Sequence, residues 1–155
     1  MAQAPLTVRI QAEPFDVAAE LAGIAAGRTD VGAVVSFTGL CRAEGGALAA
    51  LELEHYPGMA EEEMRRVAAE AAERWPLQGL VAIHRHGKIA PGEPIVLVVT
   101  ASAHRAAAFE AAEFLMDYLK TRAPFWKKEH RVDGSQGDWV EAKDVDDKAA
   151  ERWAR

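Results

Sequence analysis

Hydrophobic positions recur along the chain with two different spacings, and these spacings predict alternating strands and helices. Runs that are rich in β-branched residues, or that alternate between apolar and polar ones, predict strands at residues 7–11, 31–37, 48–55, 80–86, 95–100 and 139–142. Apolar residues three or four positions apart predict helices at residues 17–27, 60–75 and 102–122, with a short last helix after Asp146 that carries Trp153. Residues 125–131 are expected to run extended.

The order of the strands indicates how they pair. Residues 31–37 and 48–55 are adjacent along the chain and are expected to pair with each other. Residues 80–86 and 95–100 are expected to form a hairpin around the turn signal at 90–93. The strand at 95–100 is apolar throughout, which is typical of a central strand.

The helix at 102–122 has the clearest end signals. Ser102 is a good N-cap, and Pro124 is expected to end the helix near Arg122, because the residue before a proline avoids the α region. Its predicted buried stripe is Phe109, Ala112, Met116 and Leu119. No repeat or linker interrupts the pattern, so residues 1–155 are predicted to form a single α+β domain with a mixed or antiparallel sheet flanked by helices.

Composition narrows the class of protein. The 155 residues carry a formal net charge of -6, which argues against a general binder of nucleic acid or anionic membranes. The chain has one cysteine, Cys41, so it can form no internal disulfide. It starts without a signal peptide and has no apolar run long enough to cross a membrane, so the cytoplasm is the expected location.

One segment is basic within this acidic chain. Residues 120–131 hold five cations and one anion, a balance of +4 against -10 for the remainder. The simplest explanation is a solvated surface, with Lys120 and Arg122 favoured by the negative end of a helix. The functional alternative starts from Phe125 and Trp126, an apolar frame that can hold Lys120 and Lys127 close together. A lysine held among cations and partly shielded from water can exchange a proton or act as a nucleophile near neutral pH.

Two further groups of residues are candidates for anion binding. Ser102, His104 and Arg105 surround the first turn of the predicted helix, where free backbone N–H groups attract phosphate, although a plain N-cap explains them equally well. Arg42 lies just after a predicted strand. Both ends of the helix are about 25 Å apart at ~1.5 Å per residue, so a second copy would be needed to unite them.

Cys41 and the histidines are weaker candidates. Cys41 has no histidine near it in sequence, and lone cysteines mostly pack as small hydrophobic residues. His84 and His86 share one face of a predicted strand and could bind a metal with His55 or His104, but the spacings of known zinc motifs are absent. No metal or other cofactor is therefore expected.

Several segments together carry a family pattern: Leu53-Glu54-His55-Tyr56-Pro57-Gly58-Met59, Ile83-His84-Arg85, Ser102-Ala103-His104-Arg105, and the long block from Met116 to Glu129. The chain resembles the large, catalytic subunit of molybdopterin synthase from about residue 32 to residue 153. The resemblance implies an α/β-hammerhead-like fold and a sulfurtransferase. This enzyme would convert cyclic pyranopterin monophosphate to the molybdopterin dithiolene.

The resemblance also implies partners. The sulfur would arrive as a C-terminal thiocarboxylate on a small ubiquitin-like chain. The sequence ends Arg152-Trp153-Ala154-Arg155, without the Gly-Gly tail of such a donor, so the donor is expected to be a separate protein. Family members are dimers in which each copy binds one small subunit, which gives a heterotetramer.

Site residues follow from the resemblance position by position. Lys120 and Lys127 match the catalytic lysines. The substrate-binding residues it implies are Leu40, Cys41, Arg42, His104, Arg105, Lys120, Lys127, Lys128 and Glu129. The family often reads Lys-Val-Arg where this chain reads Leu40-Cys41-Arg42, so one cation is missing here.

Two rival functions remain open. A non-catalytic domain could use the same cations to bind a phosphorylated metabolite, in which case Lys127→Ala weakens binding only. A purely structural subunit would be indifferent to changes at Lys120 and Lys127.

Overall fold

The computed structural model describes residues 5–122, 125–140, 148 and 150–154. In chain order its elements are β1 (Leu6–Gln11), α1 (Val17–Ala25), β2 (Ala33–Leu40), the 3-10 turn η1 (Glu44–Gly46), β3 (Leu48–His55), α2 (Met59–Arg74), β4 (Leu77–Arg85), β5 (Gly87–Ile89), β6 (Pro94–Ser102), α3 (Arg105–Thr121) and β7 (Phe125–Arg131). The helices and strands predicted up to residue 131 are therefore present, and the α+β class is confirmed. No helix in the described part of the chain is long and apolar enough to cross a membrane.

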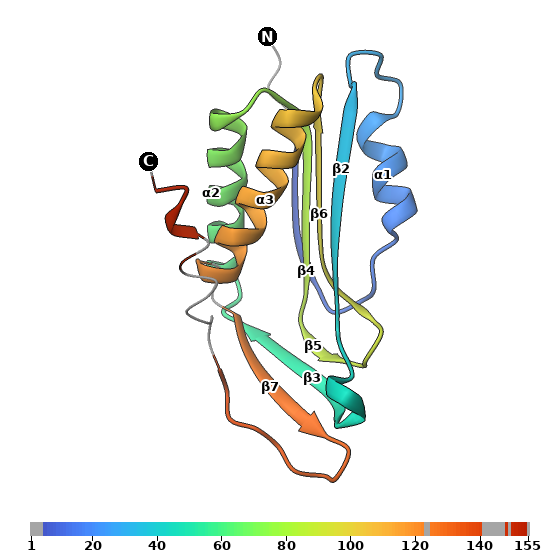
Figure 1. Ribbon diagram of the computed structural model, residues 1–155, viewed down its shortest axis with the longest axis vertical. Helices are drawn as coiled ribbons and strands as arrows, with labels where there is room; N and C mark the ends of the chain where they lie inside the picture. Colours follow the sequence, from blue (N-terminus) through green and yellow to red (C-terminus); the bar gives the residue numbers. More distant parts are fainter. Residues whose placement is uncertain (1–4, 123–124, 141–147, 149, 155) are drawn as a thin grey trace.

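The larger sheet has four strands in the order β1-β4-β6-β2. β1 runs parallel to β4, whereas the β4–β6 and β6–β2 pairs are antiparallel. β6 is central as predicted, and its residues from Val96 to Ser102 are all buried. Helices α2 and α3 cover one face of this sheet and α1 covers the other (Figure 1).

The smaller sheet has three antiparallel strands in the order β5-β3-β7 and lies at one end of the elongated molecule (Figure 1). Leu53 and Ile89 from this sheet pack with Cys41 and Leu48 in a second, separate core. The two sheets meet where β4 passes into β5 and where the end of β2 approaches the turn before β6.

The predicted pairing of residues 31–37 with 48–55 is wrong. β2 pairs with β6, and β3 pairs with β5 and β7. Between β2 and β3 the chain turns through Gly45 and Gly46, which have φ of 69° and 91° and direct β3 away from the larger sheet. The fully apolar β6 offers β2 a buried partner, while the alternating β3 suits a small sheet with one buried face.

The predicted start of the helix at 102–122 is also wrong, and so is Phe109 in its predicted buried stripe. Ser102 is the last residue of β6, and its hydroxyl donates to the Pro76 carbonyl over 2.9 Å, while His104 is the N-cap. Phe109 is 60% exposed. The buried residues are Ala108, Ala111, Ala112, Phe114, Leu115, Tyr118 and Leu119. Ala112 and Leu119 of the predicted stripe are thus buried, and Met116 packs against the main core, which confirms that part of the stripe. The predicted end near Arg122 is confirmed.

The C-terminal part is only partly described. Val140 forms an isolated antiparallel bridge with Lys127, but residues 141 and 142 of the predicted strand, Asp146 and Pro124 lie outside the described residues. The Trp153 ring packs 5.6 Å from the Trp75 ring. The end of the chain thus returns to the main core.

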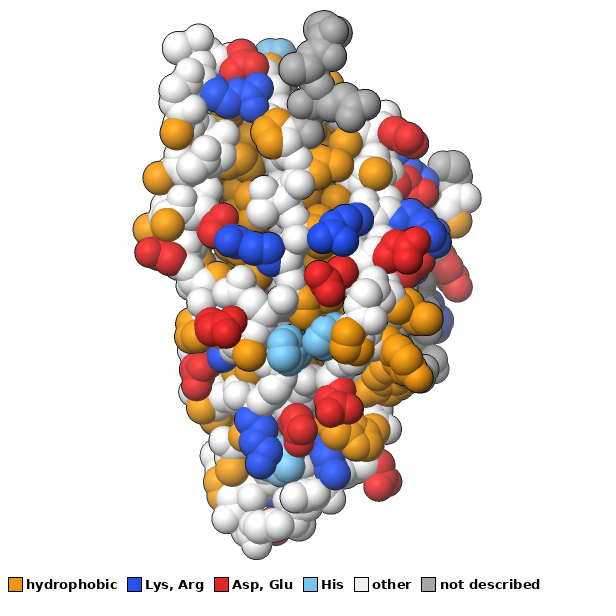
Figure 2. All heavy atoms as spheres, turned by 180° about the vertical axis from the view of Figure 1, so that it is seen from behind, with side chains coloured by type: hydrophobic (Ala, Val, Ile, Leu, Met, Phe, Trp, Pro, Cys, Tyr) orange, Lys and Arg blue, Asp and Glu red, His pale blue; other side chains and the backbone are white. Residues whose placement is uncertain are grey.

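Seen from behind, the molecule carries basic and acidic side chains interspersed over its face (Figure 2). Hydrophobic side chains lie between them, and two histidines lie side by side near the middle of this face. Charges of both signs are therefore interspersed on this face instead of forming one basic field, which agrees with the exclusion of a general polyanion binder.

Candidate active site

A pocket of about 540 Å³ opens between the two sheets. Its lining residues come from the end of β2 and the loop after it, from β3, from the start of β6, from the last turn of α3, from β7 and from the segment that follows β7. They are Leu40, Cys41, Arg42, Glu44, Leu48, Leu51, Ile95, Lys120, Lys127, Glu129, Arg131, Gly137, Asp138 and Val140. Four of these are cations and three are anions, so the pocket has a positive balance in a chain of net charge -6. Such a site favours an anionic ligand.

The two lysines reach this pocket from different elements. Lys120 belongs to the last turn of α3, and Lys127 is the third residue of β7. The backbone of Lys127 exchanges two hydrogen bonds of 2.9 and 2.8 Å with Val140, and the opposite edge of β7 pairs with β3. Lys127 therefore sits on a strand held from both sides. Lys120 and Lys127 therefore both line one pocket, while the closeness of their ammonium groups stays a prediction.

Alternation along β7 decides which of its side chains enter the pocket. Lys127, Glu129 and Arg131 line it, because successive side chains of a strand point to opposite faces. Lys128 falls on the other face, where its Nζ lies 5.3 Å from the centre of the Trp139 ring. Of the two neighbouring lysines, the fold thus places Lys127 in the pocket and leaves Lys128 out of its lining.

His84 is close to the lysines although it is far from them in sequence. Its ring stacks on Phe125, the rings being 3.8 Å apart and 17° from parallel, and its Nδ1 lies 2.8 Å from the Arg85 carbonyl oxygen. Burial, together with smaller contributions from the positive charges of Lys120 and Lys127, lowers the pKa of His84 from 6.5 to about 4. The ring is therefore neutral at pH 7, and the contact with the carbonyl requires the proton on Nδ1.

His55 extends this aromatic group. Its ring lies 4.7 Å from that of His86 and 5.9 Å from that of Phe125. Burial lowers the pKa of His55, and His86 adds to the effect. Within the described residues, no three His, Cys, Asp or Glu side chains are grouped so that they could hold a metal ion.

The loop after β2 forms the wall that contains Cys41 and Arg42. Cys41 is 3% exposed, its Sγ lies 3.7 Å from the Ile89 carbonyl oxygen, and burial raises the pKa of its thiol. A protonated, enclosed thiol is a poor nucleophile. Arg42 points outward with 80% of its side chain exposed and pairs with Glu44 over 3.3 Å, while Leu40 is 55% exposed.

His104 and Arg105 lie at the other end of α3. The helix has 17 residues, which at ~1.5 Å per residue separates its two ends by roughly 25 Å. Figure 1 shows this start of α3 at the end of the molecule away from β3, β5 and β7. Leu40, Cys41, Arg42, Lys120, Lys127 and Glu129 are thus brought together within one chain, whereas His104 and Arg105 are not.

The fold and the pocket define an α+β protein with an anion pocket built around two lysines between a four-stranded and a three-stranded sheet. The sequence model described as "MoaE protein" matches residues 10–122. The chain belongs to the MoaE protein family.

Relatives and solved structures agree with this assignment. A molybdopterin synthase catalytic subunit of Mesorhizobium japonicum is 77% identical over 147 residues, which cover 95% of this chain and 92% of that protein. The molybdopterin cofactor biosynthesis protein E of Burkholderia multivorans superimposes with a TM-score of 0.83 at 46% identity, covering 99% of both chains. The crystal structure of molybdopterin synthase from Staphylococcus aureus gives a TM-score of 0.71 at 31% identity, covering 90% of this chain and 98% of that one.

Proposed function

We propose that this chain is the catalytic subunit of a molybdopterin synthase. In this function it transfers sulfur from the C-terminal thiocarboxylate of a small ubiquitin-like partner to cyclic pyranopterin monophosphate, making the molybdopterin dithiolene. Family membership supports the reaction class. The observation that carries the assignment to a site is the meeting of Lys120, from α3, and Lys127, from β7, in one pocket.

The pocket suits both anions of this reaction. A thiocarboxylate terminus and a cyclic phosphate are each negatively charged, and Lys120, Lys127, Arg42 and Arg131 supply cations around one cavity. Preorganised cations stabilise negative charge that develops in a transition state, here on the phosphate as its ring opens. Arg42, which is largely exposed, is free to meet a substrate entering from solvent.

For each sulfur transferred, a carbon–sulfur bond forms between the substrate and the thiocarboxylate sulfur and a carbon–oxygen bond of the substrate breaks. One of these oxygens stays on the phosphate as its ring opens, and the other leaves as water. Water then cleaves the bond between that sulfur and the acyl carbon of the partner, which leaves as a carboxylate. Lys120 and Lys127 bind the terminus and carry the protons that these two steps move. Because the ring of His84 is neutral, it adds no third positive charge beside Lys120 and Lys127.

No metal or resident cofactor takes part in the proposed reaction. The partner delivers its own nucleophile, because a thiocarboxylate sulfur is already ionised and nucleophilic, so neither a cysteine of this chain nor a metal-bound water is required. We place the reaction in the cytoplasm, where an unpaired cysteine such as Cys41 stays reduced.

A second copy of the chain is proposed to complete the site. His104 and Arg105 lie too far from Lys120 in one chain to share a small substrate with it. In a dimer they can approach the pocket of the neighbouring copy and bind the phosphate there. With one small subunit per copy, the assembly is a heterotetramer.

The deciding experiment mixes the purified chain with thiocarboxylated small subunit and cyclic pyranopterin monophosphate and measures the dithiolene product. Lys127→Ala is expected to lower product formation by about 10²-fold or more, the range seen when a proton-transfer group is removed. Its fold, seen by circular dichroism, and its association with the partner should persist. Lys88→Ala is the matched control, because Lys88 is exposed on β5 and does not line the pocket.

Each rival function has its own outcome. A phosphometabolite-binding domain gives no dithiolene in wild type and weaker ligand binding in Lys127→Ala. A structural subunit gives partner binding that neither lysine change affects. An inactive wild-type protein with its cognate partner would exclude the synthase.

A further inference from the structure

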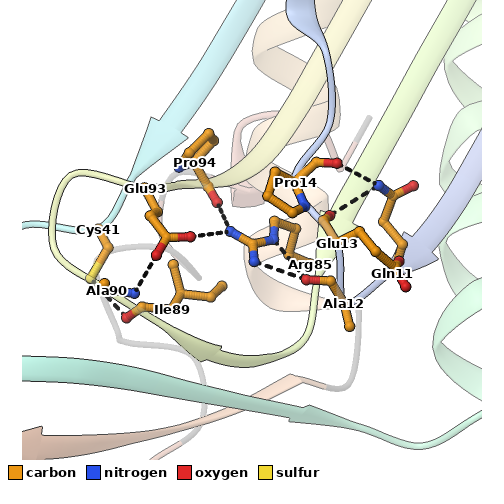
Figure 3. Close-up of polar contacts among 10 residues, drawn as sticks. All are labelled: Gln11, Ala12, Glu13, Pro14, Cys41, Arg85, Ile89, Ala90, Glu93 and Pro94. Atoms are coloured by element: carbon orange, nitrogen blue, oxygen red, sulfur yellow. Dashed lines mark hydrogen bonds and ion pairs between the residues drawn. The ribbon is translucent and has the colours of Figure 1, made fainter.

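Arg85, the last residue of β4, is a charged side chain buried beside the pocket wall. Only 6% of its side chain is exposed. Its Nε and Nη2 donate to the Ala12 carbonyl over 3.0 and 2.8 Å, and its Nη1 donates to the Pro94 carbonyl over 3.0 Å. The same Nη1 pairs with the Glu93 carboxylate over 3.1 Å (Figure 3). One guanidinium thus joins the chain after β1, the end of β4 and the start of β6.

Glu93 carries this connection onward to the loop after β2. Its second carboxylate oxygen accepts from the Ala90 N–H over 3.4 Å, which ties the turn between β5 and β6 (Figure 3). Its backbone carbonyl accepts from the Cys41 N–H over 2.9 Å, and the Gly92 N–H donates to the Cys41 carbonyl over 2.7 Å. Gly92 has a φ of 90°, a conformation that suits glycine. The turn and the loop are therefore joined by two backbone hydrogen bonds, one donated by each segment.

This link restrains that wall of the pocket, in addition to the packing of Cys41 with Leu48, Leu53 and Ile89. The β2–β6 ladder becomes irregular between Gly39 and Leu40, so regular strand pairing stops where the wall begins. The Arg42 side chain is 80% exposed and meets only the exposed Glu44 among the ion pairs of the described residues. The position of Arg42 consequently depends on how firmly its neighbour Cys41 is held by the turn.

We propose that Arg85 and Glu93 are positioning residues for this pocket: their ion pair fixes the turn at residues 90–93, and the turn holds the loop of Cys41 and Arg42 in the pocket wall. Neither Arg85 nor Glu93 lines the pocket. They act through the loop and not on the substrate. The consequence for catalysis rests on the proposed function, whereas the mechanical link does not.

The chain contains its own reporter for this link, because Cys41 is its only cysteine and is 3% exposed. Alkylation by iodoacetamide, followed by mass spectrometry on the full chain in native buffer, measures how often the wall opens. Glu93→Gln keeps the size of the side chain but removes the charge that pairs with Arg85, and is expected to speed alkylation roughly tenfold through local opening. Arg85→Lys, which keeps a charge but loses the fork of donors, should also speed it.

Matched controls separate local opening from global loss of stability. Glu63→Gln removes the carboxylate from the Arg66–Glu63 pair on α2, outside the pocket, and should leave the alkylation rate unchanged. Urea unfolding of each variant shows whether global unfolding accounts for the rate. Unchanged alkylation in a folded Glu93→Gln variant would overturn the proposal.

Steady-state kinetics distinguish a positioning role of Glu93 from a purely structural one. With the wall loosened and the lysines in place, Glu93→Gln is expected to raise KM for the cyclic substrate about fivefold at nearly constant kcat. A fall in kcat alone, in proportion to the folded fraction, would contradict positioning. If wild type proves inactive, the proposed function fails, while faster Cys41 alkylation in Glu93→Gln would still support the link.

Discussion

At the scale of single residues, the neutral His84 determines how much positive charge gathers around Lys120 and Lys127. His84 is held on Phe125 and on the Arg85 carbonyl, so its ring orientation is set by its neighbours. A charged imidazolium at this position would repel both lysines and would destabilise the packing of β7 beside it. Taken by itself, the pattern around His84 suggested only a weak metal ligand, because nothing local shows that His84 of β4 packs against Phe125 of β7.

The lowered pKa of His84 predicts how stability depends on pH. The unfolded chain takes up a proton near pH 6.5, whereas the folded chain resists until about pH 4. The contribution of His84 to the free energy of unfolding is therefore fully present above pH 6.5 and is lost as pH falls toward 4. The slope from this group approaches about 1.4 kcal/mol per pH unit. Urea unfolding of wild type and His84→Phe should show a smaller slope in the variant. The two curves should run parallel above pH 7, and equal slopes between pH 4 and 6 would contradict the assignment.

Leu40 is the residue at which this chain departs from the pattern it resembles. It lines the pocket, is 55% exposed and adds no charge. Leu40→Lys should lower KM for the anionic substrate by roughly two- to fivefold at low salt, with the gain fading as salt screens the new charge. Leu6→Lys is the control, since Leu6 is similarly exposed on β1 and lies outside the pocket. An equal effect from both changes would show that only net charge matters.

At the scale of elements, the periodicity of hydrophobic residues predicted the positions of strands and helices well. It was less successful in predicting which helix face is buried and which strands pair. The period of α2 leads directly to its buried Met64, Val67, Ala68 and Ala71. The longer α3 contains many alanines, so several of its faces are apolar enough to be buried. Close packing on β6 and β2 buries the face that contains Ala112 and Leu119 of the predicted stripe, and it leaves Phe109 outside.

The contact between the start of β2 and the end of β6 gives a prediction about packing. A Cβ on Gly32 would lie 2.1 Å from the Ala103 carbonyl oxygen, and the Gly32 N–H already donates to the Ser102 carbonyl. Because backbone must move to relieve this clash, Gly32→Ala should lower the free energy of unfolding by about 1–3 kcal/mol in urea titrations.

Gly23→Ala is the matched control for this change. Gly23 lies in α1, and a Cβ there would meet nothing within 4 Å. Alanine in a helix should be neutral or stabilise by about 0.5–1 kcal/mol. If both glycine changes destabilise alike, crowding at Gly32 is not the cause.

At the scale of the whole molecule, the two ends of α3 divide the candidate residues into two groups. The lysines meet the loop after β2 at one end, and His104 and Arg105 stand at the other. A site that uses both groups requires two copies of the chain, each giving one end of its helix to a shared pocket.

Mixed dimers test this arrangement. Lys127→Ala and Arg105→Ala should each be nearly inactive alone. Co-expressed in equal amounts, half of the dimers combine both variants, and each such dimer has one intact pocket, so activity should return to about a quarter of wild type. Co-expressed wild type and Lys127→Ala give the reference for mixing. Activity no greater than the sum of the separate variants would show that the pocket does not draw on both copies.

Local sequence patterns were sufficient to predict the α+β class, most element positions, the central place of β6 and the basic segment with its two lysines. These features depend on residues a few positions apart, and local periodicity and charge record such distances directly. The packed fold was needed to show that β3 joins a second sheet, that Lys127 and not Lys128 lines the pocket, and that His84 lies near the lysines. It was also needed to show that Arg85 is linked through Glu93 to the loop of Cys41. These depend on competition between distant segments for burial and backbone partners, and that competition is resolved only when the whole chain packs.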